Sequence, residues 1–137
     1  MANKRRFFVG SPQKAKGMAN ISDDETIDLE FLYLVKNREY KKALSIINDV
    51  KDINAVDPEI KATALHISSA RCAKSFIMRL SERKDLDYLK RDGNDKYASE
   101  LAFEIGGEED LGIFLLQKEN DQAKLQGKTI WPKPSLD

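Results

Sequence analysis

The stretch Thr63-Ala64-Leu65-His66 decides how this chain of 137 residues folds, because a related opening returns further along. Leu65 and Ile67 are apolar residues of a short helix that we predict over residues 63–70. Tyr97-Ala98 follows Thr63-Ala64 after 34 positions, and Asp92 follows Asp57 after 35. Self-similarity at a period of 33 to 35 residues is typical of an array of small helical units.

Apolar residues three and four positions apart predict six helices along the chain. The predicted helices cover residues 23–36, 39–50, 63–70, 74–83, 97–105 and 108–118. Only a few residues separate the first from the second helix of each pair, so the two must pack antiparallel. The predicted fold class is therefore all-α, with about three helix–loop–helix units.

The two ends of the chain differ from this central domain, which we place at residues 22–118. Residues 1–21 are predicted to be a basic, flexible tail, and Ser22 with Glu25 forms a capping box at the first helix. Residues 119–137 are predicted to be a C-terminal cap or tail. Trp131 either folds back over the last pair or belongs to a disordered end.

Composition excludes several classes of protein. Lysine and arginine equal aspartate and glutamate at 23 each, so no overall field attracts nucleic acid or an acidic membrane. Cys72 is the only cysteine, which excludes an intrachain disulfide and a cysteine-rich zinc site. No run of about 18 apolar residues predicts a membrane span, and the N-terminus has no signal-peptide core. We expect a cytoplasmic protein, and secretion as an effector into a host cell stays open.

The sequence offers few groups for chemistry. His66 is the only histidine, a poor start for a metal site or a catalytic triad. Cys72 lies six positions after it on a short hairpin, without a predicted oxyanion hole. Glu108-Glu109-Asp110 fits a helix N-terminus, and Asp92-Gly93-Asn94-Asp95 is a turn that lacks the terminal glutamate of a calcium loop. We therefore predict no catalytic residue, no metal site, no cofactor and no enzyme activity.

Thr63-Ala64-Leu65-His66 resembles the Thr-Pro-Leu-His signature of ankyrin repeats, and residues 52–57 resemble the loop that closes the preceding repeat. The resemblance covers about residues 28–118; Ala64 departs from the usual proline, and Cys72 stands near the usual turn glycine. It implies a short ankyrin-like stack that binds a protein partner, with Thr63 and His66 in structural roles. The partner-contacting positions that it implies are Asn54, Val56, Asp57, Glu59, Lys61, Ser68, Arg71, Arg91, Asp92, Asn94 and Lys96.

Two functions remain open at this point. The first is a non-catalytic, monomeric protein–protein interaction module, a scaffold or an effector, whose partner the sequence does not identify. The alternative is a nucleic-acid-associated regulator that uses the tail residues Lys4-Arg5-Arg6-Phe7-Phe8, because basic side chains grip phosphates and aromatic rings stack on bases.

Overall fold

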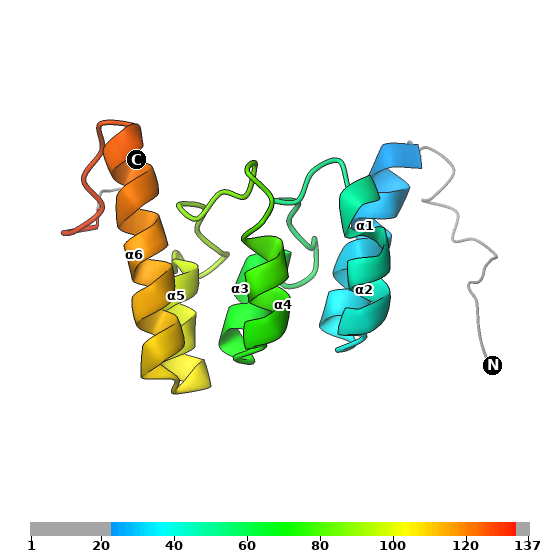
Figure 1. The fold of residues 1–137 in the computed structure, drawn as a ribbon, viewed down its shortest axis with the longest axis horizontal. Helices are drawn as coiled ribbons and strands as arrows, with labels where there is room; N and C mark the ends of the chain where they lie inside the picture. Colours follow the sequence, from blue (N-terminus) through cyan, green and yellow to red (C-terminus); the bar gives the residue numbers. More distant parts are fainter. Residues whose placement is uncertain (1–22, 134–137) are drawn as a thin grey trace.

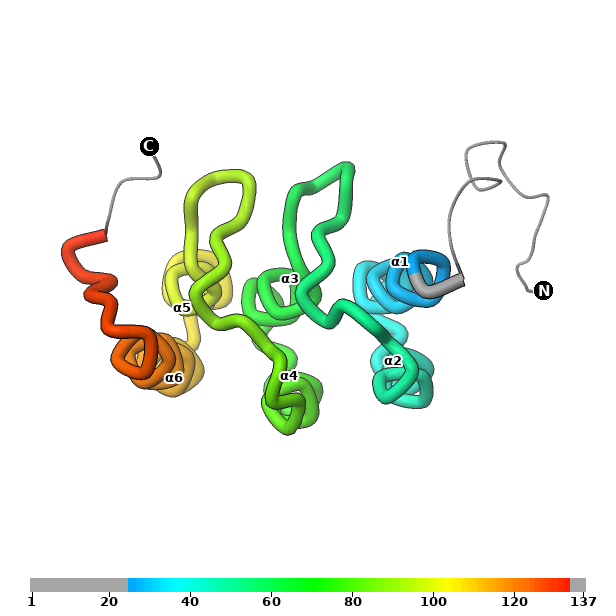
Figure 2. The backbone as a smooth tube through the Cα atoms, turned by 90° about the horizontal axis from the view of Figure 1, so that it is seen from above, coloured from blue at the N-terminus to red at the C-terminus, as the bar shows by residue number. Residues whose placement is uncertain are grey.

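The computed structural model describes residues 23–133, which form six α-helices in three pairs (Figure 1). The first pair is α1 (Asp23–Lys36) and α2 (Tyr40–Ile46), the second α3 (Ala64–Ala70) and α4 (Lys74–Leu80), and the third α5 (Ala98–Leu101) and α6 (Glu109–Leu125). Seen from above, α1, α3 and α5 form one row and α2, α4 and α6 a second (Figure 2). This part of the chain contains no strand, so the prediction of an all-α fold is confirmed.

The turn inside each pair uses the same backbone conformation. Arg38, Cys72 and Gly107 have left-handed φ angles of 61°, 55° and 67°. The three residues are 34 and 35 positions apart. Left-handed backbone is unusual for residues other than glycine, which makes its recurrence at this interval informative. The three pairs are thus similar in backbone as well as in sequence.

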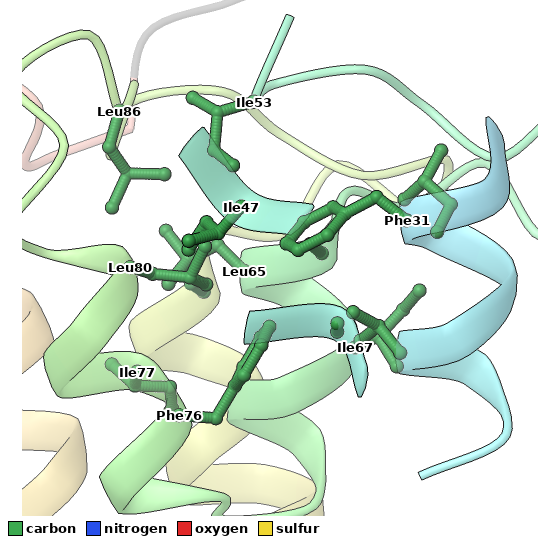
Figure 3. Packing of buried hydrophobic residues seen from close by; sticks show 14 of the residues in the cluster. Phe31, Ile47, Ile53, Leu65, Ile67, Phe76, Ile77, Leu80 and Leu86 are labelled. Carbon is green, nitrogen blue, oxygen red and sulfur yellow. The ribbon is translucent and has the colours of Figure 1, made fainter. Parts of the chain in front are cut away.

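One hydrophobic core runs through all three pairs, from Phe31 in α1 to Leu115 in α6. Leu80 and Ile77 of α4 are completely buried within it, as Figure 3 shows. The rings of Phe31 and Phe76 lie 6.0 Å apart between their centroids. A short helix pair can bury little apolar surface alone, so each pair depends on its neighbours for stability.

The structure differs from the sequence prediction at several helix ends. The last helix was predicted to end near residue 118, but α6 continues to Leu125 because Glu119 and Ala123 are buried. The second helix ends in a 3₁₀ turn (Ile47–Asp49), α4 ends at Leu80 rather than Arg83, and α5 passes into a π-helical turn (Ala102–Gly106). The predicted cap Ser22, the tail over residues 1–21 and the final residues 134–137 lie outside the described residues.

The C-terminal segment folds back onto the last pair. Ile130 is buried beside Tyr97 and Ala123 in a second, small apolar cluster. The ring of Trp131 meets that of Tyr97 edge to face, with 5.7 Å between centroids. Ile130 is thus the buried anchor of this segment, whereas Trp131 is 42% exposed.

Two loops, which we call finger 1 (residues 57–62) and finger 2 (residues 92–96), join the pairs. Figure 2 shows both projecting beyond the row of α1, α3 and α5, on the side away from the other row. Asp57 N donates to Ala62 O at 2.9 Å and closes finger 1. Asp92 N donates to Lys96 O at 3.0 Å and closes finger 2.

One backbone hydrogen bond joins the fingers to each other. Gly93 N in finger 2 donates to Lys61 O in finger 1 at 2.8 Å. Pro58 occupies the place of Gly93 in finger 1, 35 positions earlier, and has no N–H to donate. Finger 2 therefore donates this bond to the finger before it, whereas finger 1 has no equivalent donor.

Candidate partner-binding face

Aspartate carboxylates shape the turns of both fingers. Asp57 Oδ1 accepts from Glu59 N at 2.9 Å and from Ile60 N at 3.1 Å. Asp92 Oδ1 accepts in the same way from two amides of finger 2, those of residues 94 and 96. Asp57 Oδ2 also lies 3.0 Å from Lys36 Nζ of α1. Each carboxylate thus stabilises the turn of its own finger.

The ionisation of Asp57 follows from these contacts. Burial by itself raises the pKa of this carboxyl, but the Lys36 ammonium and two backbone amides outweigh burial and lower it below its ordinary value. Asp57 therefore carries its charge at neutral pH. Its side chain is only 8% exposed, so little of that charge is presented to a partner.

Asn54 holds neighbouring loops together. Its Nδ2 donates to Asp85 O at 2.8 Å, and its Oδ1 accepts from Asp87 N at 2.7 Å. The side chain therefore bridges the loop before finger 1 to the loop before finger 2.

His66 connects α3 to finger 2. Its Nε2 lies 3.1 Å from Lys96 O, an acceptor, so this nitrogen carries the proton in the neutral ring. Its Nδ1 lies 2.8 Å from Thr63 Oγ1, and Thr63 caps α3 by accepting from His66 N. The ring is 1% exposed, and this burial lowers the pKa of His66 below its ordinary value. His66 is therefore neutral at pH 7.

Four further positions implied by the family resemblance also make contacts within the chain. Ser68 is fully buried and its hydroxyl donates to Ala64 O at 2.8 Å, so the proposed face does not include Ser68. Arg71 donates to Val35 O at the end of α1, at 2.8 Å. Arg91 pairs with Asp95 at 2.8 Å, and Lys96 pairs with Glu104 at 3.1 Å. The charges of Arg91 and Lys96 are therefore engaged in ion pairs within the chain.

Most of the implied positions that stay exposed lie in finger 1 or directly before it. Val56, Glu59, Lys61 and, on finger 2, Asn94 keep exposed side chains among the positions that the resemblance implies. The sequence did not predict a role for Ile60, which lies in finger 1 and is 50% exposed. A β-branched apolar residue inside a charged turn was the signal that could have identified it. The structure thus leaves two apolar residues of this loop, Val56 and Ile60, exposed among charged residues.

Replacing Asn54 by alanine is expected to lower the free energy of unfolding by about 1 kcal/mol, because two hydrogen bonds are lost at a partly solvated site. Asn94→Ala on finger 2 is the matched control, since its side chain is exposed. Urea denaturation of both variants measures the difference. Equal stability of the two would contradict the bridging role of Asn54.

The described residues contain no group of three His, Cys, Asp or Glu side chains that could hold a metal ion. Every helix between residues 23 and 133 is too short or too polar to cross a membrane. Comparison with protein-family models, with curated proteins and with solved structures found no match for this chain.

Proposed function

We propose that this protein is an ankyrin-like module that binds a partner protein through its fingers and the adjoining row of helices. The interval of 34 and 35 residues between left-handed turns supports an ankyrin-like arrangement, as does the capping of α3 by Thr63. Both fingers project from the same side of the helices, which leaves one continuous face for a partner (Figure 2).

The observation that carries this proposal is the exposed apolar pair Val56 and Ile60. The two residues are 37% and 50% exposed, whereas Val35, Ile53 and Ile77 are at most 2% exposed. Glu59 and Lys61 stand beside them with exposed charges. An apolar centre with a polar rim is the usual composition of a protein–protein interface. A partner with its own apolar patch and mixed charges fits this face.

The nucleic-acid alternative rests on Lys4, Arg5 and Arg6, which lie outside the described residues. The finger face itself carries acidic and basic side chains together, as at Glu59 and Lys61. Nucleic-acid binding relies on clustered positive charge. Between the two functions, the geometry of the fingers therefore favours a protein partner.

A photo-crosslinking residue at position 60 tests the proposal directly. In extract from the native source, we expect discrete adducts from position 60 and none of the same size from position 78. Met78 is the matched control, because it is 42% exposed on α4, in the other row of helices. Excess wild-type protein should suppress the adducts, whereas protein carrying Val56→Ser and Ile60→Ser should not.

The same experiment can contradict the proposal. Identical adducts from positions 60 and 78, or equal suppression by both competitors, would show that finger 1 is not the binding face. Circular dichroism melting curves of the competitor check that the two serines leave the fold intact, since both replaced side chains are exposed.

A further inference from the structure

The ammonium group of Lys133 is held by a complete set of cation-binding groups near the C-terminal end of the described chain. Its Nζ donates to Asp95 O at 2.6 Å and lies 2.8 Å from Glu100 Oε1. The same nitrogen lies 5.5 Å from the ring centroid of Tyr97 and 5.8 Å from that of Trp131. The side chains of Lys133 and Glu100 are only 20% and 15% exposed. This site therefore combines a carbonyl, a carboxylate and two aromatic faces around one cation.

The similarity of the two fingers explains why the backbone carbonyl of Asp95 is available to accept a hydrogen bond. Lys61 and Asp95 are 34 positions apart and share left-handed φ angles of 57° and 63°. In finger 1 the carbonyl oxygen of Lys61 accepts a hydrogen bond from the backbone N–H of Gly93 in finger 2. In finger 2 the matching carbonyl of Asp95 accepts from Lys133 Nζ instead. The ammonium thus takes the place that a backbone N–H of a third finger would occupy.

The chemistry of the site selects a primary ammonium group. A carboxylate and a carbonyl both accept hydrogen bonds from a charged donor. Such charge-assisted hydrogen bonds are about twice as strong as neutral ones. The negative faces of aromatic rings attract a cation that lies over them. The ammonium at the end of a lysine side chain has three donors and fits these groups.

The segment that brings Lys133 to the site is short and lightly anchored. It starts at Gly127, whose φ of 66° ends α6, and Ile130 is its one buried apolar side chain. Lys128 and Thr129 are exposed. Trp131 is 42% exposed, so this part of the segment faces solvent.

We propose that Asp95 O, Glu100 and Tyr97 form a binding site for a primary ammonium group, and that Lys133 fills it from within the chain, with Trp131 on the same segment as Lys133. Residues 127–133 then act as a latch, which a lysine side chain of another protein displaces by competing for the same groups. This site is separate from Val56 and Ile60, so it does not depend on the function proposed for the fingers.

Trp131 is the only tryptophan and reports on the latch by its fluorescence. In Lys133→Ala we expect a red-shifted emission and stronger quenching by acrylamide than in the wild type, because the segment loses its hold on Glu100 and Asp95. Lys128→Ala is the matched control, since this lysine lies in the same segment and is exposed. Emission from Lys133→Ala that matches the control would overturn the latch.

Ethylammonium chloride tests the ligand class. In the wild-type protein it should increase acrylamide quenching of Trp131 by competing with Lys133 for Asp95 O and Glu100, and in Lys133→Ala, which has no ammonium to displace, it should add no further quenching. Tetramethylammonium chloride at equal concentration has no N–H donor and should not increase quenching in the wild-type protein. Ethylammonium effects no larger than those of tetramethylammonium or sodium chloride would overturn the site. The wild-type titration gives this answer even where the alanine variant folds poorly.

Discussion

At pH 8 the Glu119→Gln variant is expected to resist unfolding by about 2–3 kcal/mol more than the wild-type protein. Glu119 is completely buried, where its Oε2 accepts from Ser99 N at 3.0 Å and its Oε1 from Ser99 Oγ at 2.7 Å. Burial raises the pKa of Glu119 to about 7. The nearby charge of Glu100 also raises this pKa, whereas the hydrogen bonds from Ser99 and the charge of Lys133 lower it. Glutamine keeps the shape of the side chain and one acceptor without a charge.

The sign of this effect follows from the raised pKa. The folded state holds the proton more tightly than the unfolded state, so the stability linked to Glu119 is fully present below the unfolded value of 4.5. It is lost as the pH rises towards 7 and stays lost above. Urea denaturation should therefore show nearly equal stability of the two proteins at pH 4.5 and a clear gain for glutamine at pH 8.

Asp121→Asn is the matched control for this prediction, because Asp121 is exposed on the same helix. It should change stability little at either pH. A glutamine variant that is less stable than the wild type at pH 8 would show that the ionised carboxylate is favourable in its pocket, and would refute the prediction.

His66→Ala is expected to lower the free energy of unfolding by about 2–4 kcal/mol, through a cavity at a buried ring and the loss of two hydrogen-bonding positions. The variant removes His66 Nε2 from Lys96 O, which keeps its bond from Asp92 N within finger 2, and so frees finger 2 from α3. Urea denaturation at pH 7.5 measures the loss. A loss below 1 kcal/mol would refute the view that this ring holds the two units together.

The lowered pKa of His66 makes the free energy of unfolding depend on pH in the opposite direction from Glu119. Burial lowers this pKa, so the unfolded state binds the proton more readily than the folded state. The stability linked to His66 is present above its unfolded pKa of 6.5 and is lost as the pH falls below it. In the Glu119→Gln background, stability should fall between pH 7.5 and 5.5, and the further change His66→Ala should reduce that fall.

Most of the helices could be predicted because their apolar residues follow a helical period. Phe31 and Val35, Phe76 and Leu80, and Leu111 and Leu115 each lie four positions apart and are buried. The end of α6 could not be predicted in this way. Its residues 117–122 are polar throughout, and Glu119 is buried only because Ser99, twenty positions away, supplies its hydrogen bonds.

The candidate site was harder to predict than the fold. Sequence position alone does not show whether a polar residue faces a partner or another part of the same chain. Arg71 and Arg83 each reach a backbone carbonyl 36 positions earlier, Val35 O and Ile47 O, and Asn54 reaches forward to Asp85 and Asp87. These bonds depend on how the pairs lie side by side. Ile60 stays on the surface for the complementary reason, since no neighbouring unit covers the end of finger 1.

The hydrogen bond between the fingers also limits how such a protein can gain length during evolution. Each added finger needs an N–H at the place of Gly93 and a free carbonyl at the place of Lys61. A duplicated unit inserted after finger 1 that keeps glycine there would extend the series. A copy placed ahead of finger 1 would meet Pro58, which donates nothing, much as proline on an edge strand prevents a sheet from growing. The stack can thus lengthen from within but not from its first finger.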